Sequence, residues 1–195
     1  MNPLGTVPCI FDAGAGVFES AFVVEFLEER FPGRGTALMP AAPAERAAVR
    51  LFVSQLDFAP WYKMLMAGPS ASAEALAEHE AAVTASLAAI EARYATRSAS
   101  GPFFLGDALS AADVALLPFV DRFSASLKAH RGFDFLAACA RVAPRVAAAY
   151  AAVQARPAWK ATAQAPSFYN AAYSGYASGK PGVPRRVPAA LLAAA

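Results

Sequence analysis

Few side chains in this sequence could act as nucleophiles or metal ligands. Its two cysteines, Cys9 and Cys139, and its two histidines, His79 and His130, are far apart along the chain. Cys9 follows Pro8 in a predicted strand, where no helix N-terminus or cation would stabilise a thiolate. Cys139 lies in an apolar run and is expected to be a small buried side chain. Isolated histidines give no metal-ligand spacing. We therefore expect no metal and no catalytic residue among these four.

Two short motifs combine Ser with an acidic residue. Glu19-Ser20 precedes an amphipathic segment, and both residues suit the first turn of a helix, so by itself the pair indicates an ordinary helix start. Ser110 and Asp113 have the spacing of an N-terminal capping box, in which the hydroxyl caps an amide and the carboxylate reaches back. We expect a structural role for this box, whose loss costs about 1 kcal/mol or more.

Two short strands and a helix are predicted at the start of the chain. Residues 7–18 alternate as two strands joined by a tight loop at residues 12–16, because glycine there tolerates a positive φ. A helix follows and ends at Pro32-Gly33. Its apolar face is predicted to consist of Phe22, Val23, Phe26 and Leu27.

Beyond a Gly-, Pro- and Ala-rich linker at residues 34–43, the pattern is helical. The first of these helices is expected to run up to Pro60, and Gly101-Pro102 interrupts the chain further on. From residue 174 the composition turns to Ser, Gly, Pro and Ala, which predicts a flexible tail over 174–195. The apolar stripes of the helices are Val49, Phe52, Val53 and Leu56; Leu76, Val83, Leu87, Ile90 and Tyr94; Leu116, Leu117, Phe119, Val120 and Phe123; and Val146, Tyr150 and Val153.

Composition and charge exclude several classes of protein. The 195 residues are 57% hydrophobic and 16% charged, with 14 Phe, which is too apolar for a disordered chain. The net charge of +2 and the lack of a basic cluster, apart from Arg185-Arg186, argue against nucleic acid. No apolar run reaches the roughly 18 residues of a membrane span, and residues 1–5 do not resemble a signal peptide. We therefore expect a cytoplasmic, largely helical protein without a nucleic-acid or membrane partner.

Three stretches, taken in order, resemble the cytosolic glutathione transferase family. The resemblance extends from residue 2 to about residue 165. The omega-like, thiol-dependent reductase branch is the most similar, because of Phe18-Glu19-Ser20 and the aromatic tail. The stretches are residues 2–8 (Asn-Pro-Leu-Gly-Thr-Val-Pro) with the hairpin and residues 18–20, residues 38–40 (Leu-Met-Pro) with 43–46 (Pro-Ala-Glu-Arg), and residues 101–107 (Gly-Pro-Phe-Phe-Leu-Gly-Asp) with 109–115 (Leu-Ser-Ala-Ala-Asp-Val-Ala).

The resemblance implies a mainly α fold. A remnant of a thioredoxin-like α/β half, a β-hairpin plus a helix over residues 1–33, would be joined by the linker 34–43 to an all-helical C-terminal bundle over 44–173. In the family a first βαβ unit precedes this region and carries the catalytic Tyr, Ser or Cys. We interpret the sequence as N-terminally truncated after that unit, so that no catalytic residue is expected within it.

The resemblance also implies a glutathione site. Val7-Pro8 matches the turn that clamps glutathione, where the proline is cis and the backbone before it pairs with the cysteinyl part. Glu19-Ser20 matches the pair that binds the γ-glutamyl group, with Ser20 and free helix amides on the carboxylate and Glu19 on the ammonium. Thr6 stands where many relatives have Lys, and this difference would weaken a further contact with glutathione.

Two interpretations stay open for Trp61, Tyr62 and Met66. Aromatic residues and Met at helical spacing are usually core. In the family, however, this helix faces the cleft that holds the electrophilic substrate, and Pro60 would bend it there. Met and aromatic side chains also suit loosely specified apolar ligands.

The function implied by the resemblance is that of a glutathione transferase. The reaction would be glutathione conjugation or glutathione-dependent thiol transfer or reduction, with glutathione as co-substrate, a small electrophile or disulfide as substrate, and a homodimer as assembly. In the truncated form we expect glutathione binding and activity to be weak or absent. The alternative is a non-catalytic glutathione transferase-like module for dimerisation or protein interaction.

Overall fold

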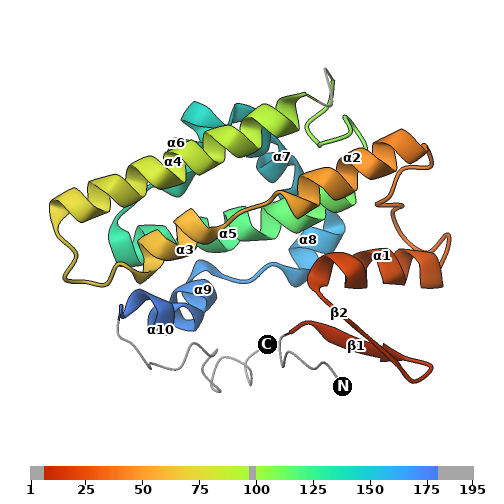
Figure 1. Ribbon diagram of the computed structural model, residues 1–195, viewed down its shortest axis with the longest axis horizontal. Coiled ribbons are helices and arrows are strands. Elements are labelled where there is room, and N and C mark those ends of the chain that lie inside the picture. The colour runs from red at the N-terminus through yellow and green to blue at the C-terminus, as the bar shows by residue number, and fades with distance from the viewer. Residues whose placement is uncertain (1–6, 97–99, 180–195) are drawn as a thin grey trace.

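The computed structural model describes residues 7–96 and 100–179, which form one β-hairpin followed by a series of helices (Figure 1). Residues 1–6 and 180–195, including Thr6 and Arg185-Arg186, lie outside the described residues. The strands are β1 (Cys9–Asp12) and β2 (Ala15–Phe18), and the helices are α1 (Ser20–Arg30), α2 (Pro43–Ser54), α3 (Ala59–Met66), α4 (Ala73–Ala95), α5 (Ala111–Arg131), α6 (Phe135–Val142), α7 (Pro144–Gln154), α8 (Pro157–Thr162), α9 (Pro166–Ala172) and α10 (Ser174–Ala177).

The hairpin turn is tighter than the five-residue loop predicted from the sequence. β1 and β2 are antiparallel, with Cys9 opposite Phe18 and Asp12 opposite Ala15. Only Ala13 and Gly14 connect them, with φ values of 47° and 86°. Two successive residues with positive φ give the type I′ turn whose twist matches that of the strands.

Helix α1 lies between the hairpin and the helical bundle (Figure 1). Its predicted apolar face is only partly correct. Val23 is buried, but 65% of Phe22 and 42% of Leu27 are exposed, while Val24 packs against the core instead. The helix is therefore rotated from the predicted orientation, because it docks against α5 with the side that carries Val23 and Val24.

Hydrogen bonds attach the predicted linker to α1 and to the start of α5. The carboxylate of Glu28 in α1 accepts the backbone N–H of Leu38 at 2.8 Å and that of Met39 at 3.1 Å. The carbonyl of Leu38 accepts the N–H of Ala111 at 2.9 Å, at the start of α5. Residues 38 and 39 thus bridge α1 to the bundle and form part of the packed structure.

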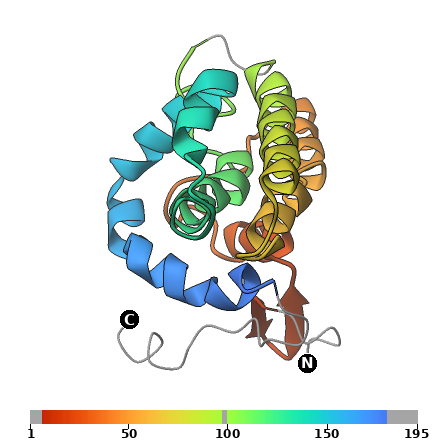
Figure 2. The same ribbon diagram turned by 90° about the vertical axis from the view of Figure 1, so that its left-hand side faces the viewer.

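Helix α5 runs through the middle of the bundle. It contacts α2 and α3 on one side and α6, α7 and α9 on the other, and Figure 2 shows it between these two groups. Four of the five residues in its predicted stripe, all except Phe119, are buried, and the stripe of α4 is buried from Val83 to Tyr94. The largest fully buried side chains are Trp61, Tyr94, Phe104, Phe123 and Phe135.

The capping box at the start of α5 forms as predicted. Oδ2 of Asp113 accepts the backbone N–H and the hydroxyl of Ser110, both at 2.8 Å. Oδ1 accepts the N–H of Phe104 at 3.0 Å and the phenol of Tyr94. Asp113 therefore also connects α4 and the loop before α5, which the spacing of the box does not reveal.

Two predicted boundaries differ in the structure. The helix that begins at Pro43 ends at Ser54, and Pro60 lies in the first turn of α3, where its missing N–H costs no hydrogen bond. The predicted flexible tail begins too early, because residues 174–177 form α10. Ala177 is buried, and its carbonyl accepts a hydrogen bond from Arg131 of α5.

Candidate functional site

The hairpin register brings together the two motifs that the resemblance assigns to glutathione. Cys9 and Phe18 form the last pair at the open end of the hairpin, so the next residues outward are Pro8 on one strand and Glu19 on the other. The Val7-Pro8 peptide bond is cis. Val7 is 90% exposed, and Pro8, Glu19 and Ser20 are exposed as well. The two motifs therefore share one open surface.

The N-terminus of α1 can accept an anion. Ser20 is the first residue of the helix, and the preceding Glu19 makes no side-chain cap. Among the described residues, no acceptor contacts the backbone N–H groups of Ser20, Ala21 or Phe22. Free N–H groups and the helix dipole together favour a carboxylate at this position.

The backbone of Glu19 is unusual for a residue with a side chain. Its φ of 68° and ψ of 118° lie on the side of the Ramachandran plot that favours glycine. Such a conformation costs of the order of 1–3 kcal/mol and is often found at binding sites. It allows the chain to turn from β2 directly into α1, which brings Ser20 to the end of the hairpin.

A cleft of about 570 Å³ opens beside Ser20, between α1, α2 and α5. Its walls are mostly apolar. An ion pair between Arg50 and Glu25, with an N–O distance of 2.6 Å, connects α2 to α1 along its side. The side chains that shape it include Ser20, Phe22, Val49, Val53, Phe119 and Arg122.

The residues considered for an electrophile site lie elsewhere. Trp61 is fully buried, and its Nε1–H donates to the hydroxyl of Ser86 at 3.2 Å. Tyr62 is half-buried and packs edge-on against Phe123 at 4.8 Å, and burial raises the pKa of its phenol. Neither these residues nor Met66 lines the cleft beside Ser20.

The cysteines and histidines form no further site in the described part of the chain. Cys139 is fully buried, and burial raises the pKa of its thiol to about 12, so it stays protonated. Cys9 is half-buried on β1. Residues 7–96 and 100–179 contain no group of three His, Cys, Asp or Glu side chains placed to hold a metal ion. No described helix is both long and apolar enough to cross a membrane.

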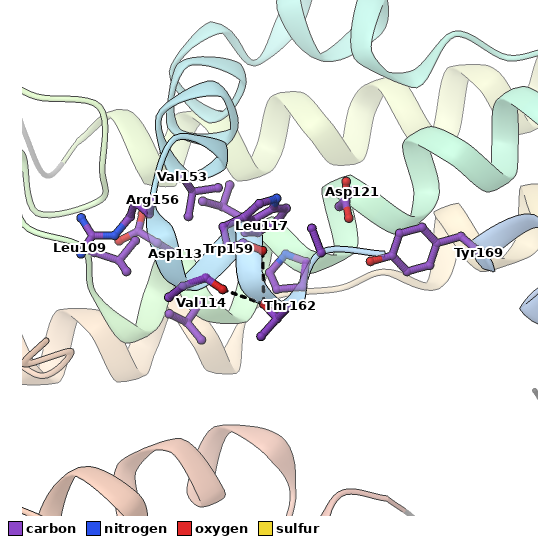
Figure 3. A pocket seen from close by; sticks show the side chains of 13 residues that line it. Leu109, Asp113, Val114, Leu117, Asp121, Val153, Arg156, Trp159, Thr162 and Tyr169 are labelled. Atoms are coloured by element: carbon purple, nitrogen blue, oxygen red, sulfur yellow. Dashed lines mark hydrogen bonds between the residues drawn. The ribbon is translucent and has the colours of Figure 1, made fainter. Parts of the chain in front are cut away.

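A second cavity, of about 330 Å³, was not predicted from the sequence. It lies between α5, α7, α8 and α9 (Figure 3). Asp121 and Tyr169 line it, and Tyr150 donates a hydrogen bond to Asp121 at 2.6 Å. No spacing signal could have revealed it, because these residues come from separate helices.

Comparison with known proteins gives consistent matches. A model of the family described as glutathione S-transferase, C-terminal domain, matches residues 49–162. The probable glutathione S-transferase GSTU6 of Oryza sativa subsp. japonica is 32% identical over 130 residues, or 64% of this chain. The structure of glutathione transferase Omega 3C from Trametes versicolor is similar with a TM-score of 0.71 and 31% identity, over 90% of this chain and 71% of that one. The tau-class MiGSTU from mango, Mangifera indica L., gives a TM-score of 0.72 and 27% identity, over 87% of this chain and 76% of that one.

These matches support the predicted fold class, a hairpin and helix followed by a helical bundle. The omega-class and tau-class structures fit almost equally well, with TM-scores of 0.71 and 0.72, so they do not favour the omega-like branch. The chain spans about half of the length of the rice relative, 55%, and less of the next curated relatives.

Proposed function

This chain belongs to the glutathione S-transferase family, and on that premise we propose that it binds glutathione for conjugation or for glutathione-dependent thiol transfer. The observation that supports the proposal is the hairpin register: Cys9 and Phe18 are its outermost pair, and Val7-Pro8 and Glu19-Ser20 are the residues that adjoin this pair on the two strands. We further propose that residues 1–33 contribute the glutathione-binding part and that residues 44–173 form the helical domain.

The proposed site would hold the two ends of the γ-glutamyl group separately. The carboxylate would accept hydrogen bonds from the Ser20 hydroxyl and the free amides of the first turn of α1. The ammonium would lie against the carboxylate of Glu19. The cysteinyl part would pair with the exposed backbone of Val7, as an added strand pairs with a sheet edge.

The electrophile or disulfide would contact the helical domain. Tyr62 and Met66 remain our proposal for this role, because both keep part of their surface exposed on α3. Trp61 cannot contact the substrate directly, because its side chain has no exposed surface, so it can only support the positions of Tyr62 and Met66. Homodimerisation likewise stays a proposal.

The proposal predicts where glutathione perturbs the protein. Two-dimensional NMR of the full chain, titrated with reduced glutathione, should shift the amides of Cys9, Ser20 and Ala21. Because β1 and β2 pair only with each other within the described residues, we expect the site to be formed for part of the time and the Kd to be weak, on the order of 1 mM.

Two controls separate the γ-glutamyl contacts from general peptide binding. The dipeptide cysteinylglycine lacks the γ-glutamyl group and should bind at least tenfold more weakly. Ser20→Ala should weaken glutathione binding, whereas Ser174→Ala, at an exposed serine of α10, should not. Shifts confined to the helical domain, or equal binding of both peptides, would contradict the proposal.

A specific observation favours the alternative function as an interaction module. Aromatic side chains of the hairpin and of α1 are unusually exposed: 61% of Phe11 and 65% of Phe22. Exposed apolar groups of this size commonly mark protein interfaces. Sedimentation of Phe11→Ser and Phe22→Ser variants tests this, since an interface there would make the wild-type chain the larger species.

A further inference from the structure

The cavity between α5, α7, α8 and α9 combines apolar walls with a polar end (Figure 3). Its volume of about 330 Å³ would hold a molecule of one or two aromatic rings. Val114 and Leu117 of α5, Val153 of α7 and the indole of Trp159 of α8 supply apolar surface. No part of the proposed glutathione site lines this cavity, so the inference below does not depend on that proposal.

The polar end is built around the carboxylate of Asp121. Oδ1 accepts the phenol of Tyr150 at 2.6 Å. Tyr169 also lines the cavity, and burial together with the nearby charge of Asp121 raises the pKa of its phenol to about 12. Burial likewise raises the pKa of the Tyr150 phenol, so both phenols keep their protons at neutral pH, and that of Tyr150 donates to Asp121. This hydrogen bond holds the carboxylate in a defined position at the cavity wall.

The negative charge of Asp121 lacks a cationic partner in the described part of the chain. None of the four ion pairs found there includes it. The neighbouring Arg122 does not line the cavity, and its guanidinium donates to the Pro118 carbonyl and the Tyr173 hydroxyl. Arg156 does line it, but at the opposite end from Asp121 (Figure 3), where it donates to Thr36. Asp113, the other carboxylate at the cavity, is fully occupied by its four donors.

A half-buried carboxylate beside apolar walls is best matched by a cation with an apolar body. We propose that this cavity binds small aromatic amines, with the ammonium group on Asp121 and the ring between Trp159 and the aliphatic side chains of α5. The Tyr150 phenol occupies one position on the Asp121 carboxylate, whose negative charge remains available to the ligand. The aromatic face of Trp159 adds a surface that attracts cations.

The test compares three probes that share one ring system: 1-naphthylmethylamine, 1-naphthylmethanol and 1-naphthoate. Calorimetry with the full chain should show the amine binding at least tenfold more tightly than the alcohol, and no measurable binding of the naphthoate. NMR shifts caused by the amine should map to residues 114–121 and 153–169. Equal affinities for amine and alcohol, or no binding of the amine, would overturn the proposal.

Substitutions test whether Asp121 is the group that binds the positive charge of the amine. Asp121→Asn should reduce amine affinity at least tenfold, to that of the alcohol, and leave alcohol binding unchanged. Asp107→Asn removes the same charge at an exposed position and should change neither. Tyr150→Phe gives an independent check should Asp121→Asn fail to fold. It removes one donor from the carboxylate, so amine binding should be retained or become severalfold tighter, and a loss of amine binding would contradict the proposal.

Discussion

Replacement of Asp113 by Ala should destabilise the protein far more than the loss of a helix cap. The carboxylate is completely buried and accepts four hydrogen bonds, from Tyr94, from Phe104 and twice from Ser110. A cap alone is worth about 1 kcal/mol. Asp113→Ala in addition leaves buried donors of α4 and of the 101–110 loop without an acceptor.

The magnitude follows from those donors. Each buried polar group left unpaired costs about 1–3 kcal/mol. The Ser110 hydroxyl can rotate to another acceptor, but the Phe104 and Ser110 amides and the Tyr94 phenol are held in place by their surroundings. With three such donors, we therefore expect a loss of at least about 3–5 kcal/mol in the free energy of unfolding. This is a large fraction of the 5–15 kcal/mol that is typical of a domain.

The free energy of unfolding is measured by urea denaturation, which is monitored by circular dichroism. The variants are compared at the same m value, the slope of this free energy against urea concentration. Ser110→Ala is the matched control, because it removes one hydroxyl and leaves the carboxylate with its other donors, so about 1 kcal/mol is expected. Tyr94→Phe combined with Asp113→Ala should cost less than the sum of the single changes, because both remove the same contact. A loss for Asp113→Ala no larger than that for Ser110→Ala would refute the view that Asp113 connects these elements.

Four other outcomes are expected. Glu19→Gly should raise stability by about 0.5–2 kcal/mol in thermal denaturation, because glycine adopts a φ of 68° without strain, and it should weaken glutathione binding. Glu91→Ala should cost about 1 kcal/mol in urea unfolding, because its carboxylate accepts the N–H of Val146 in the first turn of α7 at 3.1 Å. Stability should fall above about pH 10, and urea midpoints should show this, because burial raises the pKa of Tyr94 and of three other tyrosines. The folded chain then keeps protons that the unfolded chain releases, so the stabilisation is complete below that pH and is lost above it. Limited proteolysis should remove residues before about 36 first and leave a helical core, since few apolar groups of the hairpin are buried.

Local chemistry made much of the helical bundle predictable. The stripes of α4 and α5 follow from apolar residues at helical spacing, and the capping box at Ser110 and Asp113 depends on residues three positions apart. Cys139 was correctly assigned to the interior for the same reason, because it lies in an apolar helical run. Pro60 was harder to interpret, because a proline can either bend a helix or begin one. Which of these two happens depends on the contacts made by the turn of chain before it.

Contacts between distant segments could not be predicted in this way. The sequence by itself determined the strands, five of the ten described helices (α1, α2, α4, α5 and α7), the cap of α5 and the positions of the motifs Val7-Pro8 and Glu19-Ser20 along the chain. The tertiary structure alone decided that Phe22 faces outward, that Asp113 also contacts Tyr94, and that Asp121 lies in a cavity formed by four helices. The physical reason is that periodicity and capping act within one or two turns of chain. The direction in which a side chain points depends instead on how whole helices pack, and packing is set by the shape of all their surfaces together.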